Sequence, residues 1–455
     1  MQVTIVGGGI SGLACAFRLQ QSGHSVTLLE QSDRVGGVID SVQQDGFLFE
    51  LGPQSFLSNK AVLDLVAELK LEGQLLQADR RAPRFILIGG KLHRVPLAPP
   101  QLLLSSLLGW GTKLRLLSEP FRKSAPPEHD ESVASFVRRK FGDELLERLA
   151  GPLVSGIYAG DPERLSLRSA FTSAYDWEKK YGSVIRGAMK SRPHPSQPRP
   201  TLCSFTGGVR TIVDVLRDIL GAAVRTGVTL QTLRYRKSDG QPGFELQVSE
   251  SGQTVTMKSH AVVFATPAPT TSKLVSRLSE KASLALNQIE YAPVAVVNAG
   301  YQRSQVQHPM VGFGFLVPRK ESLRALGCVW SSSLFPGRAP EGMVSTASFV
   351  GGATDPEALN LSETELAELV EKEIAGVLGI SGPPVTRRVQ KFARAIPQYN
   401  LGHGDLLRAV RAELPQFPGL FLTGSYFEGP AIAACVEHAA KTAQAVSDFL
   451  KSLAI

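Results

Sequence analysis

Paired cysteines are missing from this sequence of 455 residues. Its four cysteines, Cys15, Cys203, Cys328 and Cys435, lie far apart and form no C-x-x-C pair. They therefore predict neither a disulfide framework nor a zinc ribbon, and a reducing compartment is the simpler expectation. The eight histidines form no H-E-x-x-H or comparable cluster, so we expect no metal site.

Long apolar runs are missing as well. No uninterrupted apolar stretch approaches the roughly 20 residues that a membrane-spanning helix needs. The opening MQVTIVGGG has neither the basic segment nor the cleavage site of a secretory signal. We therefore expect a cytoplasmic protein that does not cross a membrane. Acidic residues are fewer than basic ones, which gives a net charge of +8. Charge alone leaves nucleic acid, an anionic membrane surface and a carboxylated substrate open as partners.

The length and composition predict a globular protein of two or three lobes. With 43% hydrophobic and 20% charged residues, the chain is too apolar to be disordered, and it is too long for one ordinary core. The hydrophobic pattern indicates a strand at 2–6, a helix at 10–22 and a strand at 26–30, which is a βαβ beginning. Farther along it indicates a helical stretch at 61–78, a hairpin at 84–95, helices over 96–190, strands within 225–265 and 291–350, a helix at 363–378, and a last strand and helix at 419–424 and 432–450.

A glycine-rich turn joins the first strand to the first helix. Gly7, Gly9 and Gly12 form a G-x-G-x-x-G motif. The first glycine allows a tight turn, the second lets the backbone approach a pyrophosphate, and the third allows close packing of helix on strand. The helix N-terminus offers free N–H groups to the phosphates. Glu30 ends the second strand, where its carboxylate suits the hydroxyls of an adenosine ribose. A purely structural turn is the alternative.

Two further features favour FAD over NAD. Arg34 and the pair Gly36-Gly37 follow the second strand closely, and they add a cation and a second flexible turn that a longer cofactor can use. Near the other end of the chain, a strand ending at Gly424 precedes a helix that begins near Ile432. That helix N-terminus can stabilise negative charge on a reduced isoalloxazine. An ordinary helix-entry turn at Gly424 is the alternative.

Several segments resemble a known superfamily. GGGISG from Gly7, EQSDRVGG from Glu30, ELGPQSF from Glu50 and GLFLTGSYFEGPAIAACVE from Gly419 are similar to the GG-doublet flavoproteins, which include amine oxidases, phytoene desaturases and protoporphyrinogen oxidases. Other segments narrow the resemblance to the protoporphyrinogen oxidase branch. In chain order they are RFI from Arg84, SGIYAGD from Ser155, FGFLVP from Phe313, FVGG from Phe349, IPQYNLGH from Ile396 and YFEGPAIAAC from Tyr426.

The resemblance implies an α/β fold of three parts. A Rossmann-type FAD-binding domain would comprise 1–60, 201–290 and 393–455, and a mixed-sheet α+β substrate-binding domain would comprise 61–95 and 291–392. Residues 96–200 would form a helical lobe that associates with membranes in some relatives.

One segment of this lobe, 97–124, combines leucine-rich stretches with aromatic and basic residues. These are Trp110, Lys113, Arg115, Arg122 and Lys123. Such a segment suits the interface of an anionic bilayer, which would place the protein peripherally on the cytoplasmic face of the membrane. The alternative is a lobe that buries its leucines internally. The sequence leaves the oligomeric state open, with a homodimer as one alternative.

The resemblance also implies an activity. Members of this branch remove six electrons from protoporphyrinogen IX to give protoporphyrin IX in haem biosynthesis, with FAD as oxidant and O2 as acceptor, releasing H2O2. The same reaction on coproporphyrinogen III, giving coproporphyrin III, stays open as an alternative. A flavin amine oxidase or carotenoid desaturase fits less well, and a non-catalytic flavin-binding scaffold fits least. A covalent flavin would need a cysteine within 424–430, which has none, so we expect non-covalent FAD and no nucleic-acid partner.

Carried over residue by residue, the resemblance assigns a cofactor site and a substrate site. The cofactor site comprises Gly7, Gly8, Gly9, Ile10, Ser11, Gly12, Glu30, Gln31, Arg34, Gly36, Gly37, Gly52, Pro53, Gln54, Ser55, Thr232, Phe392, Gly424, Pro430, Ala431 and Ile432. The substrate site comprises Arg84, Gly156, Phe313, Gly314, Leu316 and Phe349. Phe392 stands where many relatives have Trp, and Thr232 and Pro430 stand where many have Val.

Each substrate assignment has a plainer reading. Arg84 would pair with a propionate because a guanidinium binds a carboxylate bidentately, but a solvated surface arginine is the alternative. Gly156 could equally be a turn glycine, and the phenylalanines and Leu316 could be plain core. We expect no acid or base among the side chains, because hydride transfer to a flavin needs mainly orientation and exclusion of water. Tyr399 and His403 are therefore given no role in proton transfer.

Overall fold

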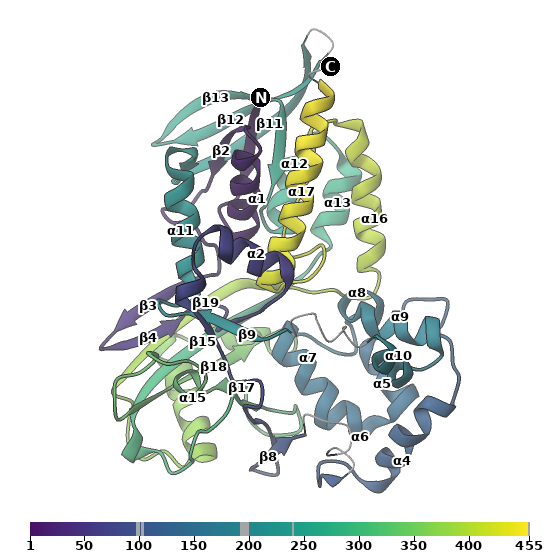
Figure 1. Ribbon diagram of the computed structural model, residues 1–455, viewed down its shortest axis with the longest axis vertical. Helices are drawn as coiled ribbons and strands as arrows, with labels where there is room; N and C mark the ends of the chain where they lie inside the picture. The colour runs from purple at the N-terminus through teal and green to yellow at the C-terminus, as the bar shows by residue number, and fades with distance from the viewer. Residues whose placement is uncertain (97–100, 102–103, 192–199, 239–240, 454–455) are drawn as a thin grey trace.

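A computed structural model of the chain describes residues 1–96, 101, 104–191, 200–238 and 241–453. A parallel five-stranded sheet forms the upper half in Figure 1, with both chain termini at its far end. The strand order is β10-β2-β1-β14-β20, and the bounds are Val224–Arg225, Ser25–Leu29, Gln2–Val6, Ala261–Phe264 and Leu420–Leu422. The first and last strands of the chain therefore belong to one sheet, and the predicted βαβ beginning is confirmed.

Helices cover one face of this sheet. They are α1 (Ile10–Gln21), α2 (Lys60–Glu68), α11 (Arg210–Leu220) and α17 (Ile432–Leu453). Their apolar faces pack into one core, in which α1 and α17 lie side by side. Residues 61–71, which the sequence analysis assigns to the substrate-binding domain, contribute Val62, Leu65, Val66, Leu69 and Leu71 to this core.

The other face carries an antiparallel three-stranded sheet and three helices. These are β11 (Val228–Ser238), β12 (Gln241–Glu250), β13 (Gln253–Ser259), α12 (Ala268–Val275), α13 (Glu280–Asn287) and α16 (His403–Glu413). They form a second core with Phe264 and Leu422 of the parallel sheet. The result is a layered α/β unit of the Rossmann type, as the sequence predicts.

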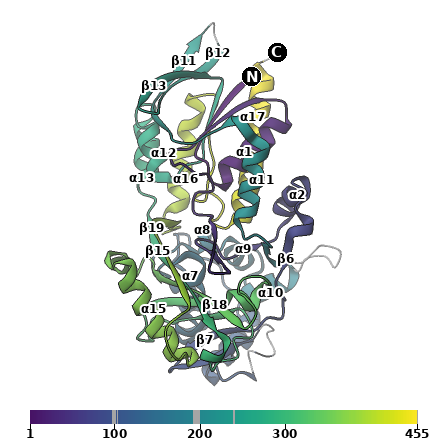
Figure 2. The same cartoon turned by 90° about the vertical axis from the view of Figure 1, so that its left-hand side faces the viewer.

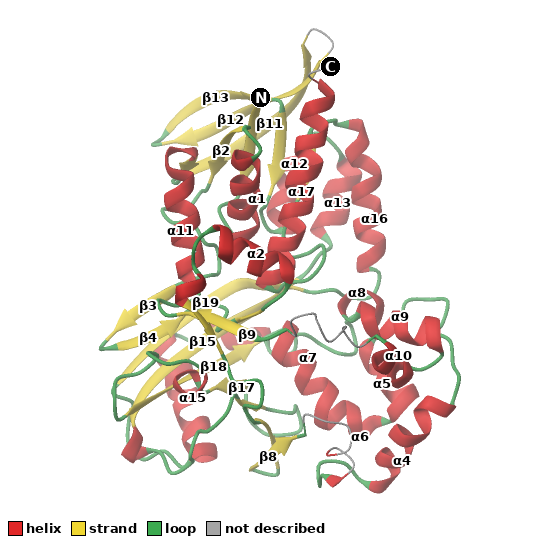
Figure 3. Cartoon of the chain, viewed as in Figure 1, coloured by secondary structure: helices red, strands yellow, loops and turns green. Residues whose placement is uncertain are grey.

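A mixed seven-stranded sheet forms the lower left of Figure 3. Its order is β19-β15-β18-β17-β16-β7-β8, and the bounds are Thr386–Pro397, Tyr291–Gln302, Met343–Gly351, Ala325–Val329, Gly314–Leu316, Arg84–Ile88 and Lys91–Val95. Only β16 and β7 run parallel to each other. Helix α15 (Glu363–Leu378) packs on one face through Leu366, Val370 and Ile374. The predicted hairpin at 84–95 and the predicted helix at 363–378 are confirmed.

The third part is helical and lies to the right of this sheet in Figure 1 and behind it in Figure 2. Its helices are α4 (Trp110–Ser118), α5 (Val133–Phe141), α6 (Asp143–Leu145), α7 (Gly151–Tyr158), α8 (Leu167–Ala170), α9 (Thr172–Tyr181) and α10 (Val184–Lys190). A buried ion pair joins Lys140 to Glu119 and Glu178, with N–O distances of 3.0 Å. Within the described part of the chain, no helix combines the length and the apolarity needed to cross a bilayer.

One predicted element is half wrong. The pattern predicts a helix over 61–78, but α2 ends at Glu68 and residues Leu75–Gln77 form strand β6. Lys70 adopts a left-handed conformation with φ of 57°, which ends the helix. The later leucines then pair with β9 (Leu202–Phe205), a partner that lies too far along the chain for local periodicity to reveal.

Candidate functional site

A cavity of about 1350 Å3 lies between the parallel sheet, the seven-stranded sheet and α7. It extends from the glycine turn after β1 to the apolar face of the second sheet. Most of the side chains predicted for the cofactor and the substrate line this one cavity. Segments from both ends of the chain meet here, because β1 and β20 belong to the same sheet.

The first glycine turn leaves open space where a cofactor is expected. Gly7 has a φ of 110°, which favours glycine. A Cβ atom on Gly12 would lie 1.9 Å from the carbonyl oxygen of Gly7, so only glycine lets the helix start so close to the strand. A Cβ atom on Gly9 would meet no atom within 4 Å. Gly9 therefore presents bare backbone to the cavity, as close approach of a phosphate requires.

Helix α1 begins at this turn without a competing acid. Its N-cap residue is Gly9, no side chain caps it, and its first turn contains no acidic residue. Ile10 and Ser11 line the cavity beside it. The first N–H groups of a helix have no partner within the helix, so they are available to an anion such as a pyrophosphate.

A second turn lies against the first. The backbone N–H of Gly36 donates to the carbonyl of Gly8 at 2.8 Å, and a Cβ on Gly37 would lie 3.5 Å from the Cα of Gly9. The carboxylate of Glu30 accepts a hydrogen bond of 2.7 Å from the N–H of Gly8. Gln31 lines the cavity beside it. The acid and both turns are thus held together where the adenosine end of a dinucleotide would lie.

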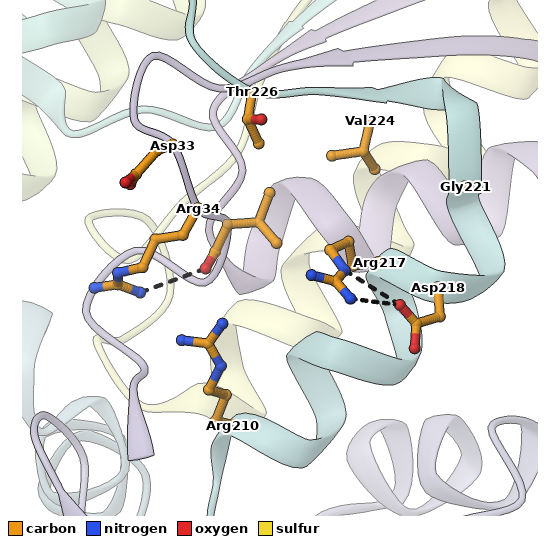
Figure 4. A pocket seen from close by; sticks show the side chains of 9 residues that line it. Asp33, Arg34, Arg210, Arg217, Asp218, Gly221, Val224 and Thr226 are labelled. Atoms are coloured by element: carbon orange, nitrogen blue, oxygen red, sulfur yellow. Dashed lines mark hydrogen bonds and ion pairs between the residues drawn. The ribbon is translucent and has the colours of Figure 1, made fainter. Parts of the chain in front are cut away.

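Arg34 lies outside this cavity. It lines a separate pocket of about 390 Å3 with Arg210, Arg217 and Asp218 (Figure 4). Its guanidinium donates to the carbonyl of Gly37 at 3.0 Å and to those of Val35 and Ile39. The structure therefore gives Arg34 the task of holding the second turn, whereas the sequence predicts a contact with the cofactor.

A buried acid anchors the loop Gly52–Ser55, all four of whose residues line the cavity. Glu50 precedes this loop and accepts hydrogen bonds from the N–H of Val209 at 2.9 Å and from Arg338 at 3.2 Å. Burial raises the pKa of Glu50 to about 6, although Arg338 opposes that shift. The side chain of Gln54 donates to the carbonyl of Glu50 at 3.0 Å. Through Glu50 these hydrogen bonds connect the loop to Val209 and Arg338, and they hold it where it lines the cavity.

The C-terminal strand and helix meet the same cavity. Gly424 and Gly429 have φ angles of 143° and 135°, which favour glycine. The loop between them leads into α17, and Pro430, Ala431 and Ile432 line the cavity. The first turn of α17 contains no acidic residue, so a second helix N-terminus faces the site. Glu428 of the preceding loop also lines the cavity, and its carboxylate pairs with Lys441 at 2.8 Å.

The far wall is mainly apolar and carries Arg84 at its edge. Leu316, Phe349 and Phe313 line the cavity from the seven-stranded sheet, as Gly314 does. Arg84 lies at the start of β7 with its guanidinium 5.5 Å from the centre of the Phe313 ring. Its side chain is exposed, and it makes no ion pair with a carboxylate within the described residues. Arg84 is therefore free to bind an acidic group.

Gly156 brings helix α7 against this wall. A Cβ atom on Gly156 would lie 2.8 Å from a methyl group of Leu316, which is too close for an undisturbed side chain. Leu153 and Ile157 of the same helix also line the cavity. Gly156 thus sets the distance between α7 and the sheet, and with it the width of the apolar part.

Three other predicted residues do not line the cavity, and some that line it were missed. Gly8 and Gly12 act through the backbone and packing, while the hydroxyl of Thr232 donates to Gln247 at 2.9 Å. A register shift in β11 between Leu230 and Thr232 turns Thr232 away. Instead Val228, Thr229 and Leu230 line the cavity, as do Arg394 and Phe392. The bulge has no signal in the sequence, so alternation along the strand could not reveal this set.

The site fits FAD. Two helix N-termini, a ribose-type acid and two backbone turns surround a cavity that continues into an apolar chamber. Among the described residues, no group of three or more His, Cys, Asp or Glu side chains could hold a metal ion. Fold and site together define an FAD-dependent oxidoreductase.

Comparison with known proteins gives the same class. Residues 10–447 match the family of flavin containing amine oxidoreductases, and the chain belongs to this family. It is 36% identical to protoporphyrinogen oxidase 1 of Spinacia oleracea chloroplasts, covering 99% of this chain and 84% of that protein. It is 31% identical to coproporphyrinogen III oxidase of Bacillus subtilis, covering 99% and 98% of the two chains.

Solved structures share the fold. A protein from Exiguobacterium, provisionally assigned as a protoporphyrinogen oxidase, superposes with a TM-score of 0.82 at 26% identity, covering 98% of each chain. Cyclohexylamine oxidase from Brevibacterium oxydans superposes with a TM-score of 0.70 at 18% identity, covering 99% of each chain. The latter likeness shows the fold alone.

Proposed function

We propose that this flavoenzyme oxidises a porphyrinogen, with protoporphyrinogen IX as substrate and protoporphyrin IX as product. O2 would accept the electrons and leave as H2O2. The observation that carries the proposal is the single cavity, which runs from the cofactor turns to an apolar chamber edged by Arg84. A porphyrinogen is a broad apolar disc with carboxylates on its rim. The chamber complements both properties, because its wall is apolar and Arg84 offers a cation to a carboxylate.

The side chains have simple tasks in this reaction. Leu316, Phe349 and Phe313 hold the macrocycle by apolar contact and exclude water from its meso carbon. Arg84 binds a propionate and so fixes which edge of the disc enters first. FAD, when bound, supplies the hydride acceptor. None of the three side chains on the apolar wall titrates. They therefore contribute by orienting the substrate and by excluding water from it.

An anaerobic experiment tests the proposal. Adding protoporphyrinogen IX to the oxidised holoenzyme should bleach the flavin absorption, and air should restore it. Arg84→Ala should raise KM about tenfold with little change in kcat, because a charged hydrogen bond to the substrate is lost. Arg84→Lys should lie in between, since an ammonium keeps the charge and loses the bidentate geometry. A flavin that neither porphyrinogen bleaches would overturn the proposal.

Coproporphyrinogen III is the second candidate substrate. The Bacillus subtilis relative that carries this name matches almost the full length of both chains. A second cation, Arg394, also lines the cavity, and coproporphyrinogen carries more carboxylates than protoporphyrinogen. A side-by-side assay of the two porphyrinogens separates the candidates by their kcat/KM ratio.

We also propose that α4 and the residues after it contact an anionic membrane surface. Trp110 and Phe121 are 77% and 80% exposed, and Leu114 and Leu117 are exposed beside them. Arg115 and Arg122 lie in the same segment and are exposed too. Residues 97–100 and 102–103 of the predicted segment lie outside the described residues. Flotation with phosphatidylglycerol vesicles should carry the protein upward, and Trp110→Ser with Phe121→Ser should reduce this; a protein that stays at the bottom would refute the contact.

A further inference from the structure

The segment Tyr399–His403, which the proposed reaction does not use, lies directly behind the C-terminal loop of the cofactor site. Tyr399 and His403 are each 2% exposed, and their rings stack with centroids 4.2 Å apart and planes 13° apart. Neither ring lines the cavity. Two polar aromatic side chains are therefore buried next to the site without touching the space where a substrate or cofactor would lie.

Both side chains bind the backbone of the loop 425–429. The hydroxyl of Tyr399 donates to the carbonyl of Ser425 at 2.7 Å and accepts from the N–H of Gly429 at 2.7 Å. The Nε2 atom of His403 lies 2.9 Å from the carbonyl of Tyr426, to which it donates. Three hydrogen bonds thus fix a loop that has no regular structure of its own.

The protonation states suit these bonds. Burial raises the pKa of Tyr399 well above its ordinary value, so the hydroxyl keeps its proton and can donate. Burial lowers the pKa of His403 to about 4, so the imidazole is neutral at physiological pH and carries its proton on Nε2. The clamp therefore adds no charge of its own next to the flavin site, where the N-terminus of α17 contributes a positive potential.

The clamp is itself held from the helical lobe. The N–H of Ser166 donates to the carbonyl of Tyr399 at 2.8 Å, and the carboxylate of Asp130 accepts from the N–H of Gly402 at 2.9 Å. Asp130 also accepts from the hydroxyl of Ser166 at 2.7 Å. The segment is thus anchored on one side to the lobe and on the other side to the loop that starts α17.

We propose that Tyr399 and His403 are positioning residues that hold the loop 425–429, and with it the N-terminus of α17, against the flavin ring. The held helix end stabilises the negative charge of the reduced flavin, so the clamp raises the reduction potential of bound FAD. The proposal rests on FAD as cofactor and not on the identity of the substrate.

Tyr399→Phe is the decisive variant, because it removes the hydroxyl and keeps the ring stack. In the holoenzyme we expect a lower midpoint potential of the flavin and a dissociation constant of FAD that rises about fivefold or more. Ser272→Ala is the matched control. Its hydroxyl is also buried and donates to a backbone carbonyl, that of Ser283 at 2.7 Å, but it lies between α12 and α13 away from the cavity.

The readouts separate positioning from simple stability. Both variants should lose a similar amount in Tm, but only Tyr399→Phe should shift the potential. A Tyr399→Phe holoenzyme with the potential and FAD affinity of the wild type would overturn the proposal. If that variant does not fold, His403→Phe, which keeps a stacked ring and removes the donor, should lower the potential, and His403→Gln, which restores an N–H donor, should recover it; wild-type potential in His403→Phe would again refute the clamp.

These measurements need no porphyrinogen. A negative result here leaves the proposed substrate untested, and a protein inactive on both porphyrinogens still permits this test.

Discussion

The strand-to-helix connections near the two ends of the chain both reach the cavity, but they are held in place by different contacts. Residues 7–9 join β1 to α1, and residues 423–431 join β20 to α17, and both connections bring a helix N-terminus to the cavity. The first turn is short and is set by glycines that contact each other, as the position of Gly12 over the carbonyl of Gly7 shows. The second is long and is held by Tyr399 and His403 from another segment. The conformation of a short turn can be specified by its own residues, whereas a long loop needs contacts from distant segments to hold its conformation.

The largest effect is expected from Gly12→Ala. The added Cβ would lie 1.9 Å from the carbonyl oxygen of Gly7, and the backbone there has little room to move. We expect a loss of about 3 kcal/mol or more in the free energy of unfolding, together with loss of bound FAD. Urea denaturation of the apoprotein measures the first and the flavin absorption of purified protein the second. A stable, yellow Gly12→Ala protein would show that the turn is not set by this contact.

Gly9→Ala should affect binding without affecting stability. No atom lies within 4 Å of the added Cβ, and Gly9 has a φ of −70°, which alanine adopts easily. We expect a change in the free energy of unfolding of under about 1 kcal/mol and an affinity for FAD that falls at least about tenfold, because the methyl group occupies space that the pyrophosphate approaches. Calorimetric titration of the apoprotein with FAD checks this. Unchanged affinity would place the pyrophosphate elsewhere.

Gly429→Ala tests the long loop in the same manner. Alanine is strained at a φ of 135°, but the nearest atom to the added Cβ is 3.3 Å away, on the side chain of Ala434. We expect a loss of about 1–2 kcal/mol in stability and a weaker effect on FAD than that of Gly9→Ala, since a long loop spreads the change over many bonds. Thermal unfolding and FAD titration measure both. A loss as large as that of Gly12→Ala would erase the contrast between the two connections.

The smallest effect is expected from Thr232→Val. Its hydroxyl bonds to Gln247 away from the cavity, so its loss should cost about 1 kcal/mol or less and leave FAD affinity unchanged. Leu230→Thr is the matched comparison, because Leu230 lines the cavity on the same strand. It should weaken FAD binding severalfold. Titration of both variants with FAD measures the two affinities. If Thr232→Val weakened FAD binding more than Leu230→Thr, Thr232 and not Leu230 would face the cofactor.

Much of the site could be predicted because its signals are local. The strand, turn and helix over 2–21 follow from a short apolar run, three glycines and helical periodicity, and each lies within a few residues of the next. Gly36, Gly37 and Gly424 follow from their places after a strand, Gly52 and residues 430–432 follow from family motifs, and all of them line one cavity. For Arg34 the sequence gives the position of a cation but not the direction of its side chain, which donates to the carbonyl of Gly37.

The sequence by itself determined the βαβ beginning and the acid that follows its second strand, because both depend on neighbouring residue types. Only the tertiary structure decided that β20 joins the sheet of β1, that β11 shifts its register before Thr232, and that Tyr399 reaches the loop before α17. These are pairings between segments far apart in the chain. The geometry of these pairings depends on how whole layers pack against each other, so a local pattern of residues cannot predict it.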